Sequence, residues 1–496
     1  MSKSDKMTWV KESGYIFAMV GSAVGFANIL AFSAQCYRNG GGAFLIPFLT
    51  ANFVIGVPML LLEGIIGNTY GLPIASAYGK VLPKVWKSCG WISALSCLTI
   101  GAFYSVLTSW SVAYTYFASQ NLISADTAYF FKHEFLKDSG SIYLFNDISL
   151  PIFICTILVS IFTWTIVAKN IGQGVEKICS WFLPLLFIII IIFSIIVAFL
   201  PGASIGFSHY LTPDFSKLKD FNLWRDVFGH VFFSFSLGIG IIVGYSRHTS
   251  KKTNLKKAMV MVALGDIFIS IISGFAIFGC VGFMSHETGI PFNEIVKSDS
   301  TFEMGFIIFP QILHTFSPYL QPIIGGLFFF CVFIAGITGV FSIVESVAGN
   351  VEVEFNLTRK KAVSISIILM FCMSIFFCFG NATYIIGALT PMVMGYTFLF
   401  GGIAQIIVFM YYDKQISNHK IWFSKNSKSF NYYFLKYASL AFLIIGFIGA
   451  LIDEYNQEYT INNTVRWSWL LGVVIIAFIL SQKKCFTPNS ERRCIP

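Results

Sequence analysis

Charged residues are scarce in this sequence: they make up 11% of its 496 residues, against roughly a quarter in an average soluble protein. A chain with so few charges cannot cover a water-facing surface. Apolar residues make up 56% of the chain, and they recur in runs of about 20 residues. The composition therefore excludes a soluble globular protein and predicts a polytopic, all-α membrane protein.

The patterns of several catalytic and metal centres are also absent. None of the 11 cysteines belongs to a CxxC pair, and most lie within apolar runs, so we interpret them as small buried residues. His230 and Asp266 are intramembrane polar residues, but no zinc-ligand spacing and no GxSxG motif accompanies them, which disfavours an intramembrane enzyme. No cleavable signal sequence is evident, because the first apolar run is long enough to stay as a helix.

The apolar runs predict about twelve membrane-spanning helices. The two predicted spans that flank Asn381 could also be read as one long hairpin. The twelve spans are residues 14–36, 43–67, 91–117, 150–168, 177–200, 225–246, 258–284, 322–350, 362–380, 383–411, 432–452 and 464–482.

Lysine and arginine gather in alternate loops, which explains the formal charge of +9 without a nucleic-acid partner. If the spans alternate in direction, all these loops lie on one side of the membrane, and the acidic segment 453–458 lies on the other. The positive-inside rule then predicts that both termini are cytoplasmic. We expect a multi-pass protein of the cytoplasmic (inner) membrane. The basic segments are 3–11, 80–87, 247–257, 359–361, 414–428 and 483–493.

Two predicted spans contain residues that weaken a helix. The first holds Gly21, Ser22, Gly25 and Asn28 at mid-membrane depth, and the sixth holds the sequence FFSFSLGIGI. Irregular backbone at this depth is tolerated where it lines a cavity. Close packing of small residues would explain one such span. The same pattern of glycine and polar residues recurs five spans later, which favours broken helices in a five-plus-five inverted repeat.

This repeat predicts how the chain is divided. The predicted parts are a cytoplasmic segment at 1–13, a first repeat at 14–200, an extracellular loop at 201–224, a second repeat at 225–411, and two peripheral spans with a cytoplasmic tail at 412–496. A solute site is expected where the two broken helices meet at the middle of the bilayer.

Eight segments together resemble the neurotransmitter:sodium symporter family, in family order, over residues 9–412. The segments are GSAVGFANI (21–29), NGGGAFLIPF (39–48), IGVPMLLLE (55–63), FYSVLTSW (103–110), LTPDFSKLKD (211–220), VFFSFSLGIG (231–240), FIAGITG (333–339) and NLTRKKAV (356–363). No long, cysteine-bearing loop separates the third and fourth spans, so the chain looks like the prokaryotic, leucine-transporter-like branch. The resemblance implies a symporter, not an enzyme, that couples Na⁺ to an amino acid or similar zwitterion by alternating access. A channel or a non-transporting sensor is the alternative.

For the solute, the resemblance implies that the carboxylate contacts backbone amides between Ala23 and Ala27 and the hydroxyl of Tyr104. The ammonium would contact the carbonyls of Ala23, Phe233 and Ser234. Helix N-termini favour anions and C-termini favour cations, so a zwitterion suits the two breaks. The implied side-chain pocket consists of Ile100, Phe233, Ser236, Ile239, Gly339 and Ile343.

The resemblance also implies two sodium sites made of oxygen ligands, which a hard cation prefers. The first site would use Ala23, Asn28, Ser234 and Asp266, the last standing where most relatives carry asparagine. The second site would use Gly21, Val24, Ala335 and Thr338. Gly339 stands where the family usually has a serine, so the second site loses one ligand.

Asp266 and Ser270 lie one helical turn apart and bear on chloride use. Ser270 matches a serine of the chloride site in chloride-dependent relatives, which alone would predict a chloride requirement. Asp266 supplies a negative charge beside the first sodium, so we predict chloride-independent transport, with charge balance from Asp266 and Ser270. A protonated Asp266 with a packing role is the alternative.

The gates depart from the family pattern at the outer end. Relatives pair an arginine with an aspartate there, whereas this chain has Ala31 and, by approximate alignment, Thr390. Outer closure is then expected to rest on Tyr104 and Phe233, with His230 as a further candidate. At the inner end, Lys6 and Trp9 resemble the family's latch, and its acid partner is either Glu352 or Glu354.

Overall fold

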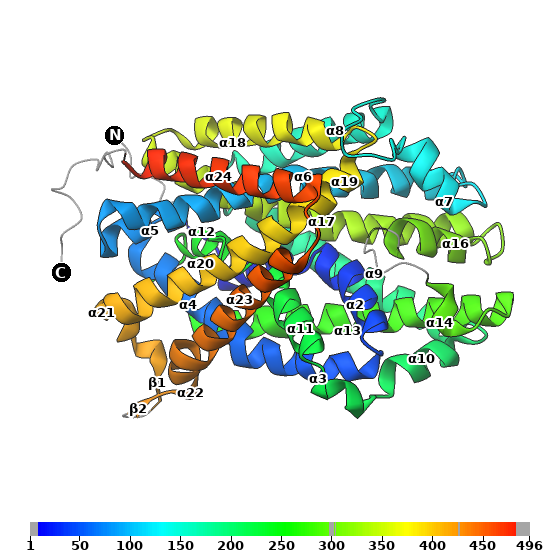
Figure 1. Cartoon of the computed structure of the whole chain (residues 1–496), viewed down its shortest axis with the longest axis horizontal. Helices are drawn as coiled ribbons and strands as arrows, with labels where there is room; N and C mark the ends of the chain where they lie inside the picture. The colour runs from blue at the N-terminus through cyan, green and yellow to red at the C-terminus, as the bar shows by residue number, and fades with distance from the viewer. Residues whose placement is uncertain (1–7, 297–301, 303, 425–426, 483–496) are drawn as a thin grey trace.

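The computed structural model describes residues 8–296, 302, 304–424 and 427–482. Most of these residues are helical, and the strands among them are two antiparallel pieces of two residues each (Figure 1). Ten of the described helices are long and apolar enough to cross a membrane, and the bent pair 12–23 and 27–38 forms an eleventh candidate span. The prediction of an all-α, polytopic membrane protein is therefore confirmed.

The first half of the chain supplies the broken first span and the long helix α6. Its helices are α1 (Glu12–Ala23), η1 (Ala27–Ala31), α2 (Phe32–Arg38), α3 (Gly42–Ala51), η2 (Asn52–Gly56), α4 (Val57–Tyr70), α5 (Ile74–Val81), η3 (Lys84–Trp86), α6 (Lys87–Ser119), α7 (Thr127–Tyr129), η4 (Phe130–Phe135), α8 (Leu150–Val167), α9 (Val175–Ala198), α10 (Ala203–Leu211) and η5 (Phe215–Lys219).

The second half supplies the other interrupted span and the long helices α13 and α17. Its elements are α11 (Phe221–Ser234), α12 (Ile241–Ser246), α13 (Leu255–Thr288), α14 (Phe292–Ile295), η6 (Met304–Ile308), α16 (Phe309–Leu313), α17 (Gln321–Glu354), α18 (Arg359–Ser374), η7 (Ile375–Phe377), α19 (Ala382–Thr390), η8 (Pro391–Tyr396), α20 (Thr397–Ile406), η9 (Ile407–Tyr412), α21 (Lys414–Ser417), η10 (Lys420–Trp422), β1 (Phe423–Ser424), β2 (Ser427–Lys428), α22 (Phe430–Tyr433), η11 (Phe434–Ser439), α23 (Leu440–Asn456) and α24 (Ile461–Gln482).

The spans match the predicted ones within a few residues, except for the sixth. The predicted span 225–246 is two helices, α11 and α12, and neither is long enough to cross a membrane alone. The predicted spans on either side of Asn381 are separate helices that end at Phe377 and begin at Ala382. The inverted repeat and the division of the chain that follows from it stay predictions.

Local backbone geometry explains both interruptions. After α1 the chain turns to extended geometry at Val24, and the two parts of the first span meet at 52°. Between α11 and α12, three residues adopt positive φ angles: Ser236 (53°), Gly238 (83°) and Gly240 (79°). A right-handed helix cannot pass through such residues. At Gly238 a Cβ atom would lie 2.4 Å from the carbonyl oxygen of Phe398, so this position also needs glycine for close approach.

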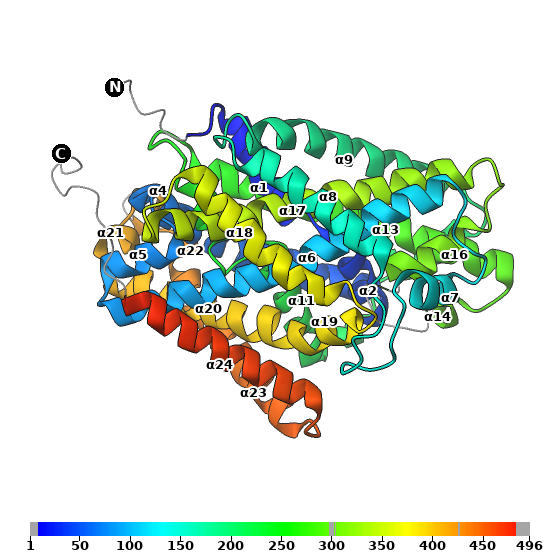
Figure 2. The same cartoon turned by 90° about the horizontal axis from the view of Figure 1, so that it is seen from above.

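Burial separates a central set of helices from a peripheral pair. In the most apolar windows of α6, α17 and α13, 89%, 83% and 78% of the residues are buried, whereas the figures are 17% for the span ending in α23 and 22% for α24. Figure 2 shows α23 and α24 at one side of the bundle, away from α9 and α1. The broken helices therefore lie among buried helices, and the last two spans lie at the lipid-facing side.

Candidate functional site

A small cavity of about 30 Å³ lies where the two helix breaks meet α6 and α17. This volume has room for about two water molecules. All ten residues predicted to bind the solute line it: Ala23, Ala27, Ile100, Tyr104, Phe233, Ser234, Ser236, Ile239, Gly339 and Ile343. The structure thus brings together residues from four spans that are up to 320 positions apart in the sequence.

Tyr104 fills much of the space between the first break and α17. Its hydroxyl accepts a hydrogen bond from the backbone N–H of Phe26 at 3.3 Å, and its ring lies edge-on to the Phe26 ring, 4.9 Å away. A Cβ atom at Gly25 would lie 2.2 Å from the Tyr104 oxygen, and one at Gly339 would lie 2.9 Å from its ring. Both glycines are therefore needed for Tyr104 to lie across the cavity.

Four polar side chains meet beside this cavity, from the first break, α11 and α13. The amide nitrogen of Asn28 lies 2.6 Å from Asp266 Oδ1, 3.0 Å from Ser234 Oγ and 2.9 Å from Ser270 Oγ. Ser234 also donates a hydrogen bond to Asp266 Oδ1. The second carboxylate oxygen of Asp266, Oδ2, is buried and has no hydrogen-bond partner among the described residues.

This polar cluster contains three of the four predicted ligands of the first sodium, and Ala23 lines the adjoining cavity. Ser270, predicted to share in charge balance, belongs to the cluster as well. The amide oxygen of Asn28 is engaged, because it accepts a hydrogen bond from the N–H of Gly25 at 2.9 Å. An unpartnered carboxylate oxygen among hydroxyl and amide groups is chemically suited to a cation.

Of the four predicted ligands of the second sodium, Gly21 and Thr338 are in contact. A Cβ atom at Gly21 would lie 3.1 Å from Thr338 Cβ and 3.4 Å from its hydroxyl oxygen. The Thr338 hydroxyl lies 3.1 Å from the carbonyl oxygens of Ile334 and Ala335. Val24 adopts extended geometry directly after α1, so its carbonyl leaves the helical pattern.

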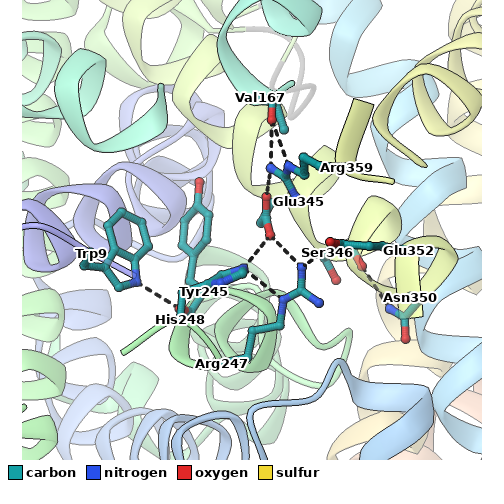
Figure 3. Close-up of polar contacts among 10 residues, drawn as sticks. All are labelled: Trp9, Val167, Tyr245, Arg247, His248, Glu345, Ser346, Asn350, Glu352 and Arg359. Atoms are coloured by element: carbon teal, nitrogen blue, oxygen red, sulfur yellow. Dashed lines mark hydrogen bonds and ion pairs between the residues drawn. The ribbon is translucent and has the colours of Figure 1, made fainter. Parts of the chain in front are cut away.

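We call the end of the bundle that carries Trp9 the inner end. Lys6 lies outside the described residues. The indole N–H of Trp9 donates to the carbonyl of Tyr245 at 3.0 Å, and the two rings meet edge-on at 5.4 Å (Figure 3). Both candidate acid partners are engaged with other cations: Glu352 accepts from Arg247 at 3.0 Å, and Glu354 pairs with Lys87.

A second, larger cavity of about 870 Å³ lies toward the opposite, outer end, between α2, α11, η8 and α23. Phe233 and Phe398 line both cavities, and their ring centroids are 6.3 Å apart. His230 and Thr390 also line the larger cavity. His230 packs against three phenylalanines, and both of its ring nitrogens lack a hydrogen-bond partner among the described residues.

Ser22 and Gly25 of the first break also line the small cavity, and sequence reasoning missed three further lining residues: Ile241, Ser342 and Phe398. Ser342 lies three residues after the predicted Gly339, so helical spacing alone was a usable signal. Phe398 had none, because it is one of 54 phenylalanines.

Sequence reasoning also missed an ion cluster at the inner end, formed by Arg247, His248, Glu345, Glu352 and Arg359 (Figure 3). Glu345 was a usable signal, because an acid inside a predicted span is expected to have a charged partner.

Comparison with known proteins gives consistent matches. Residues 6–125 and 118–487 match the profile of the sodium:neurotransmitter symporter family. An uncharacterized sodium-dependent transporter of Methanocaldococcus jannaschii is 33% identical over 408 residues, which is 82% of this chain and 82% of that protein. An uncharacterized sodium-dependent transporter of Haemophilus influenzae is 32% identical over 56% of this chain. The sodium- and chloride-dependent GABA transporter 2 of Rattus norvegicus is 26% identical over 72%. The matches span 61% and 64% of the length of these last two proteins.

Proposed function

The chain belongs to the sodium:neurotransmitter symporter family, and from this premise we propose that it imports an amino acid or similar small zwitterion by alternating access. Members of this family are transporters rather than enzymes, and Na⁺ is the co-transported ion. The multi-pass helical structure agrees with that assignment. The solute class, the mechanism of access and the roles of individual residues are the proposal.

The observation that carries the proposal is the polar cluster beside the small cavity. Asp266 Oδ2 is a buried carboxylate oxygen without a partner among the described residues, and an uncompensated buried charge is costly. A sodium ion bound there would compensate that charge. The Ser234 hydroxyl and the Asn28 side chain are already within hydrogen-bonding distance of Asp266, so they would complete an oxygen-rich first sodium site with the carbonyl of Ala23.

Sodium binding at this site would change the hydrogen-bond partners of Asn28. In the structure the Asn28 amide nitrogen faces the polar cluster while its oxygen accepts from the Gly25 N–H, so the amide must turn and release that N–H before its oxygen can contact a cation in the cluster. The released N–H belongs to the first helix break, where backbone amides are proposed to hold the solute carboxylate. Sodium and solute binding would therefore be coupled through Asn28.

The negative charge of Asp266 also supports chloride-independent transport. Ser270 Oγ lies 2.9 Å from the Asn28 amide nitrogen, within the same cluster as the carboxylate. A chloride ion near Ser270 would face Asp266, and like charges at this range repel. Charge balance by Asp266, with Ser270 as a neutral neighbour, is thus the favoured arrangement.

The second sodium site is proposed at the contact of Gly21 with Thr338, completed by the carbonyls of Val24 and Ala335. It lacks the serine hydroxyl that relatives have at the position of Gly339. In the structure a side chain at 339 would also press on the Tyr104 ring. We propose that this site is the weaker of the two.

The solute pocket is proposed to accept a bulky apolar or aromatic side chain. Ile100, Ile239 and Ile343 supply an apolar lining, and the absence of a side chain at Gly339 would leave space on α17 once Tyr104 moves away. In the structure the cavity has closed around Tyr104 and Phe233, so a solute can enter only if these side chains move. Weak competition by glycine and strong competition by leucine, methionine or tryptophan is the expected order.

The two ends support alternating access. The inner end is closed by an ion cluster, while the outer cavity is separated from the small cavity by Phe233 and Phe398. We propose that the inner end faces the cytoplasm, because the basic loops predicted to be cytoplasmic adjoin α5, α12 and α21, at one end of the bundle in Figure 1. Both termini would then be cytoplasmic.

The test is an uptake panel of labelled amino acids in proteoliposomes. We expect accumulation driven by an inward sodium gradient and unaffected when gluconate replaces external chloride. Uptake that is equal in sodium and in choline would contradict the proposal, and downhill flux without gradient-driven accumulation would favour a channel.

A further inference from the structure

The ion cluster at the inner end has one titratable member whose protonation would change its bonding. Figure 3 shows Arg247 and His248, which follow α12, facing Glu345 and Glu352 of α17, with Arg359 of α18 on the other side of Glu345. With a neutral imidazole, the two arginines and two glutamates cancel in formal charge. The cluster is buried: the side chains of Arg247, His248 and Glu345 are 4%, 7% and 0% exposed.

Glu345 is the shared anion of this cluster. Its Oε2 accepts from Arg359, whose guanidinium also donates twice to the carbonyl of Val167, at 2.8 and 3.1 Å. Arg359 is therefore fixed from two sides. Glu345 Oε1 accepts from Arg247 Nη2 at 3.2 Å and lies 3.0 Å from His248 Nε2.

The same imidazole nitrogen also faces Arg247. Arg247 Nε lies 2.9 Å from His248 Nε2. An arginine Nε always carries a hydrogen, so Nε2 must be the acceptor and the imidazole must be neutral with its proton on Nδ1. If Nε2 gained a proton, two N–H groups would point at each other, while Glu345 Oε1 would gain a new donor. A proton on His248 and the guanidinium of Arg247 thus compete for one place beside Glu345.

Among the described residues, the charged groups that face His248 come from the elements packed against it. Arg247 precedes it in the chain, Glu345 contacts it from α17, and Arg359 acts on it from α18. Glu352 is reached through Arg247, and the phenol of Tyr245 lies in the same region. Burial, and then the positive charge of Arg247, hold the pKa of His248 below its ordinary value of 6.5.

Protonation of His248 is linked to opening of the inner end. In the closed inner end the imidazole binds a proton less readily than it would in water. Opening the inner end hydrates His248 and returns its pKa toward 6.5. Protons therefore bind the open form better, and the closed form loses stability as the pH falls below about 6.5.

The N-terminal segment reports on this opening. The backbone N–H of Trp9 donates to the carbonyl of His248 at 3.4 Å, and its indole donates to Tyr245. Displacement of Arg247 and His248 would release both contacts at once.

We propose that His248 is a proton-binding site of this transporter, at which a proton displaces Arg247 from Glu345 and opens the inner end. Protons on the side of the membrane that the inner end faces are then a regulatory ligand. This proton site is not part of symport, and its test needs neither sodium nor solute. Either proposal can therefore fail while the other stands.

The test is hydrogen–deuterium exchange of the purified full-length protein in lipid nanodiscs at pH 7.5 and 5.5. Rates are divided by those of the unfolded chain at the same pH. We expect the peptides covering 9–15 and 241–248 to exchange about three- to tenfold faster at pH 5.5, below the hundredfold ceiling that one proton allows over two pH units. Peptides of α6 should not change.

The decisive variant is His248→Gln, which keeps an acceptor for Arg247 but cannot be protonated. It should show equal protection at both pH values, whereas His419→Gln, at the same end but outside the ion cluster, should respond like the wild type. His248→Asn serves as a second neutral variant, and a melting temperature near that of the wild type identifies the variants that fold. An unchanged acid response in a folded neutral variant, or no acid response in the wild type, overturns the proposal.

Discussion

At the inner end two arginines, two glutamates and an imidazole lie within hydrogen-bonding distance of one another, whereas at the outer aperture two phenylalanine rings lie 6.3 Å apart. Removing one member of a buried ion pair typically costs about 3 to 5 kcal/mol, because the other charge is left unpaired. An aromatic pair contributes about 0.5 to 1.5 kcal/mol beyond its buried area. Substitutions should therefore shift the balance between the two ends more strongly at the inner end than at the outer aperture.

The largest effect is expected where the inner ion cluster loses its shared acid. Glu345→Gln leaves Arg247 and Arg359 without their common anion, at a cost of about 3 to 5 kcal/mol to the closed inner end. Sodium-driven accumulation should fall by more than a hundredfold, while exchange of the 241–248 peptide rises. Glu352→Gln is the control, since Glu352 is 19% exposed and contacts Arg247 alone among the described arginines. Equal losses in the two variants would argue against Glu345 as the shared anion.

The second-largest effect is expected at Asp266, which lies between the two ends. Asp266→Asn removes the carboxylate that faces the proposed first sodium but keeps its size, so we expect sodium affinity to fall about tenfold to a hundredfold or uptake to acquire a chloride requirement. Sodium titrations of uptake in chloride and in gluconate measure both. Ser270→Ala, which removes a neutral neighbour of Asn28, should have a smaller effect. Unaltered sodium affinity and anion independence in Asp266→Asn would refute the role given to this carboxylate.

A smaller effect is expected at Gly349 of α17, against which the guanidinium of Arg247 lies. A Cβ atom there would be 3.0 Å from Arg247 Cζ, so Gly349→Ala should displace the guanidinium and weaken closure by about 1 to 3 kcal/mol. Hydrogen exchange of residues 241–248 should accelerate at neutral pH. Gly244→Ala is the matched control, because its nearest new contact is 3.4 Å, an ordinary packing distance. Equal exchange in the two variants would contradict the close packing of Arg247.

The smallest effect is expected at the outer aperture. Phe398→Leu removes one ring of the Phe233 pair and should cost about 0.5 to 1.5 kcal/mol, which is about a threefold to tenfold change in apparent solute affinity. Competition binding at saturating sodium measures it. Phe376→Leu, at a position that is 56% exposed, should leave the affinity unchanged. A loss as large as that of Glu345→Gln would remove the contrast between the two ends.

The spans were predictable because composition decides them: long apolar runs leave a helix little freedom to begin or end elsewhere. The ten cavity residues were predictable from the resemblance, residue by residue. The inner ion cluster was not, since Arg247 and Glu345 are 98 positions apart and nothing in their local sequence pairs them. The partners of Glu352 and Glu354 were unpredictable for the same reason: Glu352 contacts Arg247, whereas Glu354 contacts Lys87.

The contacts of the last two spans make one wall of the outer cavity rigid. Arg466 of α24 binds Glu454 and the carbonyl of Ala388, each at 2.8 Å, so it ties the terminal pair of helices to α19. The hydroxyl of Tyr396 donates to the carbonyl of Ala450 at 2.6 Å, which ties η8 to α23. The η8 and α23 faces of the cavity are therefore fastened to each other.

The opposite wall, formed by α2 and α11, is the one free to move. An ion pair between Arg225 of α11 and Asp453, 2.6 Å apart, crosses from this wall to the rigid one, and its side chains are 38% and 53% exposed. Exposed pairs of this kind contribute about 0 to 1 kcal/mol and are screened by salt. The Arg225–Asp453 pair is thus a weak brake on how far the outer cavity widens, and a higher ionic strength at the outer end loosens it.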